Sequence, residues 1–292
     1  MKTDYICIPC MLRQTVETVH LAVEDEETRK KAINAVLNYL QDIPYDLPPP
    51  EVGKYIYSIM HEVTGNPDPY KSIKEKYNKA ALDLYDDLLK IVLMSRRPLH
   101  TAAKLAVAGN VIDFGASSKD VQMRQLISSV HDVSFEIDHF DQFIHDMKQS
   151  KQIIYLADNA GEIVFDYLFI EMLKRYYPEL HLQITAVVRG APVINDATIE
   201  DARMIGLDKI AKVIDNGDNA PATLLKNASP EMKKYYDDAD LIISKGMGNY
   251  ETLDDEKRLI YYLLKVKCPL ISKRINAEIG SMIFKRNSDY HD

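Results

Sequence analysis

The chain has 292 residues, with 36 lysines and arginines against 44 aspartates and glutamates, so its formal net charge is −8. This acidity disfavours nucleic acid and anionic membrane as principal partners, because such surfaces bind basic proteins. We expect neither a signal peptide nor a membrane span, since no sufficiently long apolar run is present. Three cysteines, an odd number, argue against a disulfide framework and favour a reducing, cytoplasmic location.

The first third of the sequence is expected to be helical. Apolar residues recur at spacings of three and four, the helical period, through residues 11–22 and 26–40. Prolines 48–50 interrupt this pattern, and a further helix is predicted to begin after them. The later helices are predicted at residues 51–63, 70–95 and 98–108, and a loop or short strand at 109–115.

From residue 151 onward, short apolar runs alternate with helical patterns, which is typical of a parallel α/β sheet. The predicted strands are residues 152–157, 182–188, 210–214, 241–244 and 269–272. A chain of this length is expected to form two structural units. We predict a mostly helical N-terminal domain over residues 1–125 and an α/β domain over residues 126–292, whose parallel-type sheet is flanked by helices.

Polar residues follow each predicted strand. They are Asp158-Asn159, Arg189, Asp215-Asn216, Lys245 and Lys273-Arg274. The carboxyl ends of strands in a doubly wound sheet share one edge, where ligands bind, so we expect charges of both signs to converge in one crevice. The alternative interpretation is that these strand ends are simply solvated.

Asp158 and Asn159 are the leading candidates for a metal site. Their carboxylate and amide oxygens suit Mg²⁺ or Mn²⁺, and Asp196, which follows the next strand, could supply a third ligand. Helix capping explains one such residue, but two adjacent ones exceed what a cap needs. The helix start at Gly161-Glu162 is expected to offer N–H groups to an anion such as phosphate.

Lys245 is predicted to offset phosphate charge, with Gly246 allowing the backbone to approach a ligand closely. The pair Gly246-x-Gly248 is not a dinucleotide fingerprint, because Glu251 stands where a third glycine belongs. The turn at Asp215 could bind substrate or be an ordinary turn.

Cys7 and Cys10 form a CxxC motif near the N-terminus. A structural zinc site needs four ligands, and Cys268, expected to begin a buried strand, is the third and last cysteine. A redox CxxC would be expected beside a βαβ unit. A role in packing or local contacts is therefore the favoured interpretation.

Six short stretches, in their order and spacing, match one known family. They are residues 7–10 (CIPC), 64–70 (TGNPDPY), 108–113 (AGNVID), 158–162 (DNAGE), 188–197 (VRGAPVINDA) and 244–251 (SKGMGNYE). Through them the chain resembles the damage-control phosphatases, which are related to the human acidic-residue methyltransferase-like protein. The resemblance spans essentially the whole chain and is greatest to the compact microbial and archaeal branch with an N-terminal CxxC.

The resemblance implies a helical N-terminal portion and a Rossmann-like α/β domain that binds metal and phosphate. It implies a divalent metal ion held by Asp158, Asn159 and Asp196, and a phosphate-contacting lysine at Lys245. The implied activity is metal-dependent hydrolysis of small phosphorylated metabolites, either sugar phosphates or damaged phosphometabolites. Mg²⁺, Mn²⁺, Co²⁺ and Ni²⁺ are all compatible with oxygen ligands.

Our mechanistic hypothesis is that the metal activates a water molecule for attack on phosphorus. The candidate catalytic residues are Asp158, Lys245 and Glu162, and the candidate substrate-binding residues are Arg189, Asn195, Gly246, Asn249 and Asp215. Lys245 and Arg189 would neutralise charge on the transferring group, and either Glu162 or Asp215 would act as general base.

Three alternatives remain open at this point. Asp158 could be a nucleophile that forms an aspartyl-phosphate, although Ala160 stands where haloacid-dehalogenase-like enzymes carry a second aspartate. A methyltransferase using S-adenosylmethionine would need a glycine-rich loop, and only Gly161 is available after the first strand. A non-catalytic metal- or metabolite-binding protein would share most of these residues. Nothing in the pattern indicates an oligomeric state.

Overall fold

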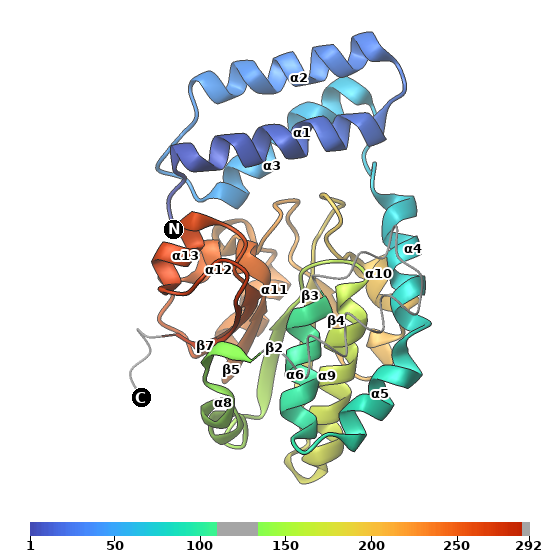
Figure 1. Cartoon of the computed structure of the whole chain (residues 1–292), viewed down its shortest axis with the longest axis vertical. Coiled ribbons are helices and arrows are strands. Elements are labelled where there is room, and N and C mark those ends of the chain that lie inside the picture. Colours follow the sequence, from blue (N-terminus) through green and yellow to red (C-terminus); the bar gives the residue numbers. More distant parts are fainter. Residues whose placement is uncertain (110–133, 288–292) are drawn as a thin grey trace.

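A computed structural model describes residues 1–109 and 134–287 (Figure 1). Its centre is a seven-stranded sheet with the strand order β1-β7-β6-β5-β2-β3-β4. The strands are β1 Phe135–Asp138, β2 Gln152–Leu156, β3 Gln183–Val188, β4 Lys212–Asp215, β5 Leu241–Lys245, β6 Ile260–Lys265 and β7 Met282–Arg286. Neighbouring strands are parallel except β6 and β7. From β2 the chain runs outward through β3 and β4, then returns to the other side of β2 at β5, which creates a topological switch point between β2 and β5.

Helices precede the sheet and cover both of its faces (Figure 1). The N-terminal helices are α1 Ile8–Ala22, α2 Glu26–Gln41, α3 Pro49–Thr64, α4 Lys71–Leu82, α5 Tyr85–Met94 and α6 Pro98–Ala108. The later helices are α8 Phe140–Met147, α9 Glu162–Tyr176, α10 Ile199–Met204, α11 Pro230–Asp238, α12 Gly246–Leu253 and α13 Pro269–Ile275. Short 3₁₀ turns occur at Tyr5–Cys7, Pro178–Leu180, Leu207–Lys209 and Leu225–Asn227.

Helices α1 to α3 form a separate layer with its own apolar core. Val19, Val36 and Met60, one from each helix, are at most 1% exposed. Val193, from the loop after β3, belongs to the same core. The α1–α3 layer therefore packs on a loop that follows a carboxyl strand end, and Figure 1 shows it lying across that edge of the α/β body.

Successive side chains of each strand point to opposite faces of the sheet, and helices pack on both faces, so both are buried. In β2, Ile153 and Tyr155 join the core formed with α5, α6 and α9. Ile154 and Leu156 join the core on the other face, formed with α11, α12 and α13. The predicted α/β class, with a mostly parallel sheet flanked by helices and a helical N-terminal region, is confirmed.

Several predicted boundaries were wrong. Residues 269–272 are not a strand but the start of α13, with Pro269 in its first turn and Cys268 at its N-cap. Lys273 and Arg274 consequently lie in the last turn of that helix rather than at a strand end. The single helix expected over residues 70–95 is divided into α4 and α5, and β1, β6 and β7 were not predicted.

Of the loop or strand expected at residues 109–115, only Gly109 lies within the described residues. The expected domain boundary at residues 125 and 126 also lies outside them and stays a prediction. Among the helices of residues 1–109 and 134–287, none combines the length and apolar character that crossing a membrane requires.

Candidate active site

The residues predicted at the ends of β2 and β3 come together through backbone pairing of the loops that follow. Asn159 and Asp196 form an antiparallel bridge, and the Ala197 N–H donates to the Asp158 carbonyl at 2.8 Å. Ile194, close to this pairing, has a φ of +39°, a conformation that β-branched residues avoid. Such strain is retained where the surrounding structure fixes a functional loop. The structure thus places Asp158, Asn159 and Asp196 side by side at the switch point.

Gly246, directly after β5, lies against Asp158 at the end of β2. It has a φ of +80°, and a Cβ at this position would collide with the carboxylate of Asp158. Only glycine therefore lets the start of α12 lie directly against Asp158. This close approach was predicted from the sequence, although the partner turns out to be a protein carboxylate.

Arg189 joins the two aspartates. Its Nε donates to Asp196 Oδ2 at 2.6 Å, and its Nη2 lies 3.6 Å from Asp158 Oδ1. The Arg189 side chain is 1% exposed, and its Nη2 has no hydrogen-bond partner. A buried guanidinium nitrogen without a partner is unusual and suits an incoming anion.

Asn159 and Glu162 complete the oxygen-rich side of the site. Asn159 Nδ2 donates to Asp158 Oδ2 at 2.9 Å and lies 3.3 Å from Glu162 Oε2. The amide oxygen of Asn159 makes neither of these bonds and is the atom that could bind a cation. Glu162, the first residue of α9, is 2% exposed.

We call six buried residues the charged cluster: Asp158, Glu162, Asp166, Asp196, Arg189 and Lys245. Its four carboxylates face only two cations, which leaves an excess of two negative charges when all are ionised. Burial, followed by the charges of Asp196 and Glu162, raises the pKa of Asp158 well above its usual range. Burial also raises the pKa of Asp196, although Arg189 opposes this.

A divalent cation fits this arrangement, because it would neutralise the excess charge and prefers oxygen ligands. Asp158, Asn159 and Asp196 could hold it. Within residues 1–109 and 134–287, no three His, Cys, Asp or Glu side chains converge closely enough to hold a metal by themselves. A cation here would therefore use the Asn159 amide oxygen together with water or substrate oxygens, as Mg²⁺ commonly does.

Lys245 lies behind Glu162 rather than facing open space. Its Nζ donates to Glu162 Oε1 at 2.7 Å, to Asp166 Oδ1 at 2.6 Å and to the Ala106 carbonyl at 2.6 Å. A lysine has three N–H donors, so none is left for a phosphate in this arrangement. The phosphate-contacting role of Lys245 stays a prediction. Asp166 was missed, although its position four residues after Glu162 on one helix was a usable signal.

The N–H of Gly161 is not available to a phosphate, contrary to the expectation from the sequence. It donates to Asn78 Oδ1 at 2.7 Å, and Asn78 Nδ2 donates to Asp201 Oδ1 at 2.7 Å. Asn78 lies in α4 and is fully buried. This contact joins segments 83 residues apart, which no local pattern in the sequence reveals.

Three predicted substrate-binding residues have other contacts. Asn249 is fully buried, and its amide bonds the Thr223 N–H at 2.8 Å and the Lys245 carbonyl at 2.8 Å. The backbone carbonyl of Asn195 accepts from the Ala160 N–H at 2.8 Å. Asp215 Oδ1 accepts from the Gly217 N–H at 2.9 Å, which is ordinary turn chemistry.

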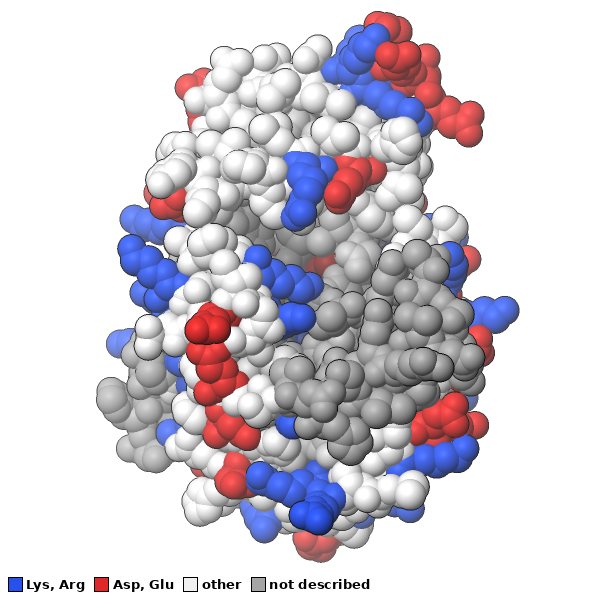
Figure 2. Space-filling model, viewed as in Figure 1, with Lys and Arg blue, Asp and Glu red and all other residues white. Residues whose placement is uncertain are grey.

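The α1–α3 layer closes over this edge through ion pairs that the sequence did not predict. Lys54 of α3 bonds Asp218, in the loop after β4, and Lys226 Nζ lies 2.6 Å from Glu51 Oε1. Figure 2 shows a hollow between this layer and the α/β body, with lysine and arginine side chains on both sides of it. Such a hollow would favour the approach of an anionic ligand.

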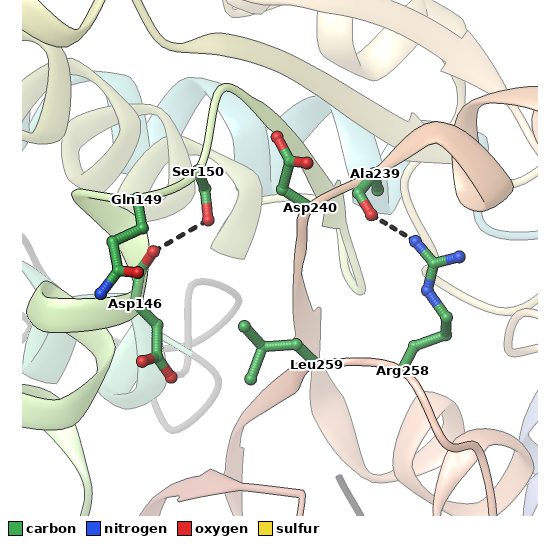
Figure 3. A pocket seen from close by; sticks show the side chains of 7 residues that line it. All are labelled: Asp146, Gln149, Ser150, Ala239, Asp240, Arg258 and Leu259. Carbon is green, nitrogen blue, oxygen red and sulfur yellow. Dashed lines mark hydrogen bonds between the residues drawn. The ribbon is translucent and has the colours of Figure 1, made fainter. Parts of the chain in front are cut away.

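A different pocket, of about 390 Å³, opens at the opposite edge of the sheet (Figure 3). It is lined by Asp146, Gln149, Ser150, Ala239, Asp240, Arg258 and Leu259. Its charged groups are satisfied within the protein, since Asp240 accepts two backbone N–H groups and Arg258 donates to two carbonyls.

The three cysteines are free thiols. Cys7 is half-buried and precedes α1, Cys10 is exposed, and Cys268 Sγ accepts from the Ile271 N–H at 3.4 Å. Burial raises the pKa of Cys7, and the nearby Glu251 and Cys268 raise it further. The fold thus brings Cys268 close to the CxxC motif.

Comparison with known proteins gives the family. Residues 3–283 match the model of the damage-control phosphatase ARMT1-like domain. The chain is 33% identical to the damage-control phosphatase of Archaeoglobus fulgidus, over 98% of this chain and 99% of that protein. It is 30% identical to the damage-control phosphatase PH1575 of Pyrococcus horikoshii, again over 98% and 99%.

The fold agrees with this match. The crystal structure of the DUF89 family protein PH1575 from Pyrococcus horikoshii is similar to this chain with a TM-score of 0.91. The similarity covers 99% of this chain and 100% of that structure, at 31% sequence identity. The chain therefore belongs to the damage-control phosphatase ARMT1-like family.

Proposed function

We propose that this protein is a metal-dependent phosphatase that hydrolyses small phosphorylated metabolites, either sugar phosphates or damaged phosphometabolites. Two relatives that bear the name damage-control phosphatase align with nearly the whole chain, which supports the phosphatase activity. The observation that carries the metal dependence is the charged cluster, where four carboxylates face two cations and Arg189 Nη2 has no hydrogen-bond partner. The excess of carboxylates favours a cation, and Arg189 Nη2 favours an anion. A metal-bound phosphate ester would supply both.

Asp158, Asn159 and Asp196 would hold the divalent ion. When bound, the ion supplies Lewis-acid polarisation of the phosphoryl group and activation of the attacking water. Arg189 donates from Nη2 to a phosphoryl oxygen and offsets the charge that develops there. Glu162 accepts the proton of the attacking water, because its carboxylate is held next to Asn159 and Asp158.

The first test is release of phosphate by chelator-stripped protein from p-nitrophenyl phosphate and a panel of sugar phosphates. Mg²⁺, Mn²⁺, Co²⁺ and Ni²⁺ are each added in turn, with Asp158→Ala as the loss-of-site variant. Asp215→Ala is the matched control, since its carboxylate also follows a strand but only closes a turn. Metal-dependent turnover that is lost in Asp158→Ala and kept in Asp215→Ala supports the proposal.

The absence of metal-dependent turnover above the Asp158→Ala background would overturn the proposal for these substrates. Titration with S-adenosylmethionine then separates the remaining classes. Stoichiometric binding would indicate the methyltransferase, whereas metal or metabolite binding without turnover would indicate a binding protein. We further propose a cytoplasmic location, supported by the three free thiols.

A further inference from the structure

A second group of buried polar side chains lies directly behind the candidate metal site. It consists of Tyr155 on β2, Asp166 on α9 and Lys245 on β5, each at most 1% exposed. Asp166 Oδ1 accepts from Tyr155 Oη at 2.6 Å and from Lys245 Nζ at 2.6 Å. Lys245 Nζ also donates to Glu162 Oε1 at 2.7 Å. Lys245 therefore links Asp166 to the candidate site.

Asp166 is not needed merely to neutralise Lys245. Glu162 already provides one carboxylate for Lys245, so Asp166 adds a negative charge to a cluster that has too many. Its Oδ2 is buried without a hydrogen-bond partner. Burying a charge in this way is costly, and packing alone is better served by an apolar side chain. A carboxylate at this position calls for a specific role.

The geometry of Lys245 shows what Asp166 can do. With one N–H bonded to Asp166 and another to the Ala106 carbonyl, the third N–H has a fixed direction, toward Glu162 Oε1 at 2.7 Å. The other oxygen of Glu162 then lies 3.3 Å from Asn159 Nδ2. Each oxygen of the Glu162 carboxylate therefore has its own donor: Lys245 bonds Oε1 and Asn159 bonds Oε2. Together the two bonds fix the plane of the carboxylate.

We infer that Asp166 is a positioning residue: through Lys245 it holds the Glu162 carboxylate toward the candidate metal and phosphate site. Tyr155 assists by fixing Asp166 Oδ1. The inference deepens the proposed function and rests on it for the role of Glu162. It also assigns Lys245 to the support of Glu162 instead of to direct contact with phosphate. Residues that orient others around a metal commonly contribute a large share of activity.

The chain offers a matched control at the opposite edge of the sheet. Asp146 Oδ2 accepts from Tyr261 Oη at 2.6 Å and lies 3.1 Å from Arg286 Nε. Asp146 therefore has the same kind of tyrosine and cation partners as Asp166, but it lies far from the charged cluster. Asp146→Ala and Asp166→Ala remove comparable contacts, and only the second should disturb Glu162.

The kinetic test compares Asp166→Ala, Asp166→Asn and Asp146→Ala with the wild type, using the metal and substrate that give the best turnover. For Asp166→Ala we expect kcat to fall by about 10–100-fold with KM changed less than about twofold. Asp166→Asn keeps an oxygen acceptor for Lys245 and should lose less. Asp146→Ala should keep its kcat. Thermal unfolding checks that each variant is folded.

An unchanged kcat in Asp166→Ala, or an equal loss in Asp146→Ala, would overturn the inference. A loss expressed wholly in KM would also overturn it, because it would indicate that the Lys245 region binds substrate directly. Crystal structures of the two alanine variants give a readout that does not need turnover. Glu162 should leave its position in Asp166→Ala and keep it in Asp146→Ala, whereas an unmoved Glu162 contradicts the inference. If Glu162 moves but the wild type hydrolyses nothing, the positioning stands and the proposed function fails.

Discussion

The α1–α3 layer lies across the sheet edge at which the charged cluster is found, yet different forces hold the two regions. The layer is built on apolar side chains such as Val19, Val36 and Met60, which are almost fully buried and need nothing from outside the chain. The cluster is buried just as deeply but has two more negative than positive groups. Apolar packing accounts for the layer, whereas the excess of negative charge in the cluster supports the proposal that it binds a cation.

The largest effect should come from removing one of the two positively charged side chains of the charged cluster. Arg189→Met leaves Asp158 and Asp196 without their shared partner, so we expect a loss of about 3–5 kcal/mol in the free energy of unfolding. Turnover should fall by about 10²–10³-fold. Urea unfolding and phosphate release measure the two effects, and exposed Arg175→Met is the control. A variant as stable and active as the wild type would refute the electrostatic description.

A cavity in the α1–α3 layer should act differently. Met60 is fully buried, so Met60→Ala should reduce the free energy of unfolding by about 2–5 kcal/mol. Met94→Ala is the matched control because Met94 is 86% exposed. The stabilisation that added metal gives should be the same in both variants. A change of metal-induced stabilisation in Met60→Ala alone would show that the two regions are coupled.

The pH dependence of the metal-free protein should reveal the excess charge. Burial and the nearby carboxylates raise the pKa of Asp158 in the folded state above its unfolded value. Its contribution to stability is then present below the unfolded pKa and is lost as pH rises through the folded pKa. Asp158→Asn should therefore melt above the wild type without metal, by an amount that grows with pH. Melting curves from pH 5 to 8, with Asp215→Asn as control, test this. Equal pH dependence would contradict it.

The smallest effect is expected at the junction of the two regions. Lys54 bonds Asp218; the side chain of Lys54 is 26% exposed and that of Asp218 is 4% exposed. Lys54→Met should lower the free energy of unfolding by about 1–2 kcal/mol, because the buried Asp218 carboxylate loses its cation but keeps the bond from Asn227 Nδ2. Lys30→Met, on the exposed face of α2, serves as its control. A loss of several kcal/mol in urea unfolding would mean that this ion pair, and not apolar packing, holds the layer in place.

The sequence predicted the parts of this site that depend on strand order. Asp158, Asn159 and Arg189 follow apolar strands, and the carboxyl ends of parallel strands meet at one edge, so their convergence followed from a local pattern. The start of α13 was mistaken for a strand because a short apolar run beginning at Pro269 has no periodicity that distinguishes the two. Strand β6, which is apolar along most of its length, was missed for the same reason.

The remaining parts of the site depend on contacts that local patterns do not encode. Asn78 Oδ1 of α4 accepts the hydrogen bond of the Gly161 N–H. From the sequence alone, this N–H was expected to be available to an anion. The direction of Lys245 is set by Asp166 and by the Ala106 carbonyl, which comes from a helix 139 residues earlier in the chain. Strand order locates a lysine at the edge, but only tertiary packing determines which way its side chain points.

We propose that the charged cluster holds one divalent cation. Isothermal titration calorimetry of chelator-stripped protein with Mn²⁺ and Mg²⁺ tests it directly, with Asp196→Ala as the site variant and Asp215→Ala as the control. We predict one ion bound per chain in the wild type and in Asp215→Ala, and none in Asp196→Ala. A wild-type chain that binds no divalent ion, or an Asp196→Ala variant that binds it equally well, would contradict a metal site in the charged cluster.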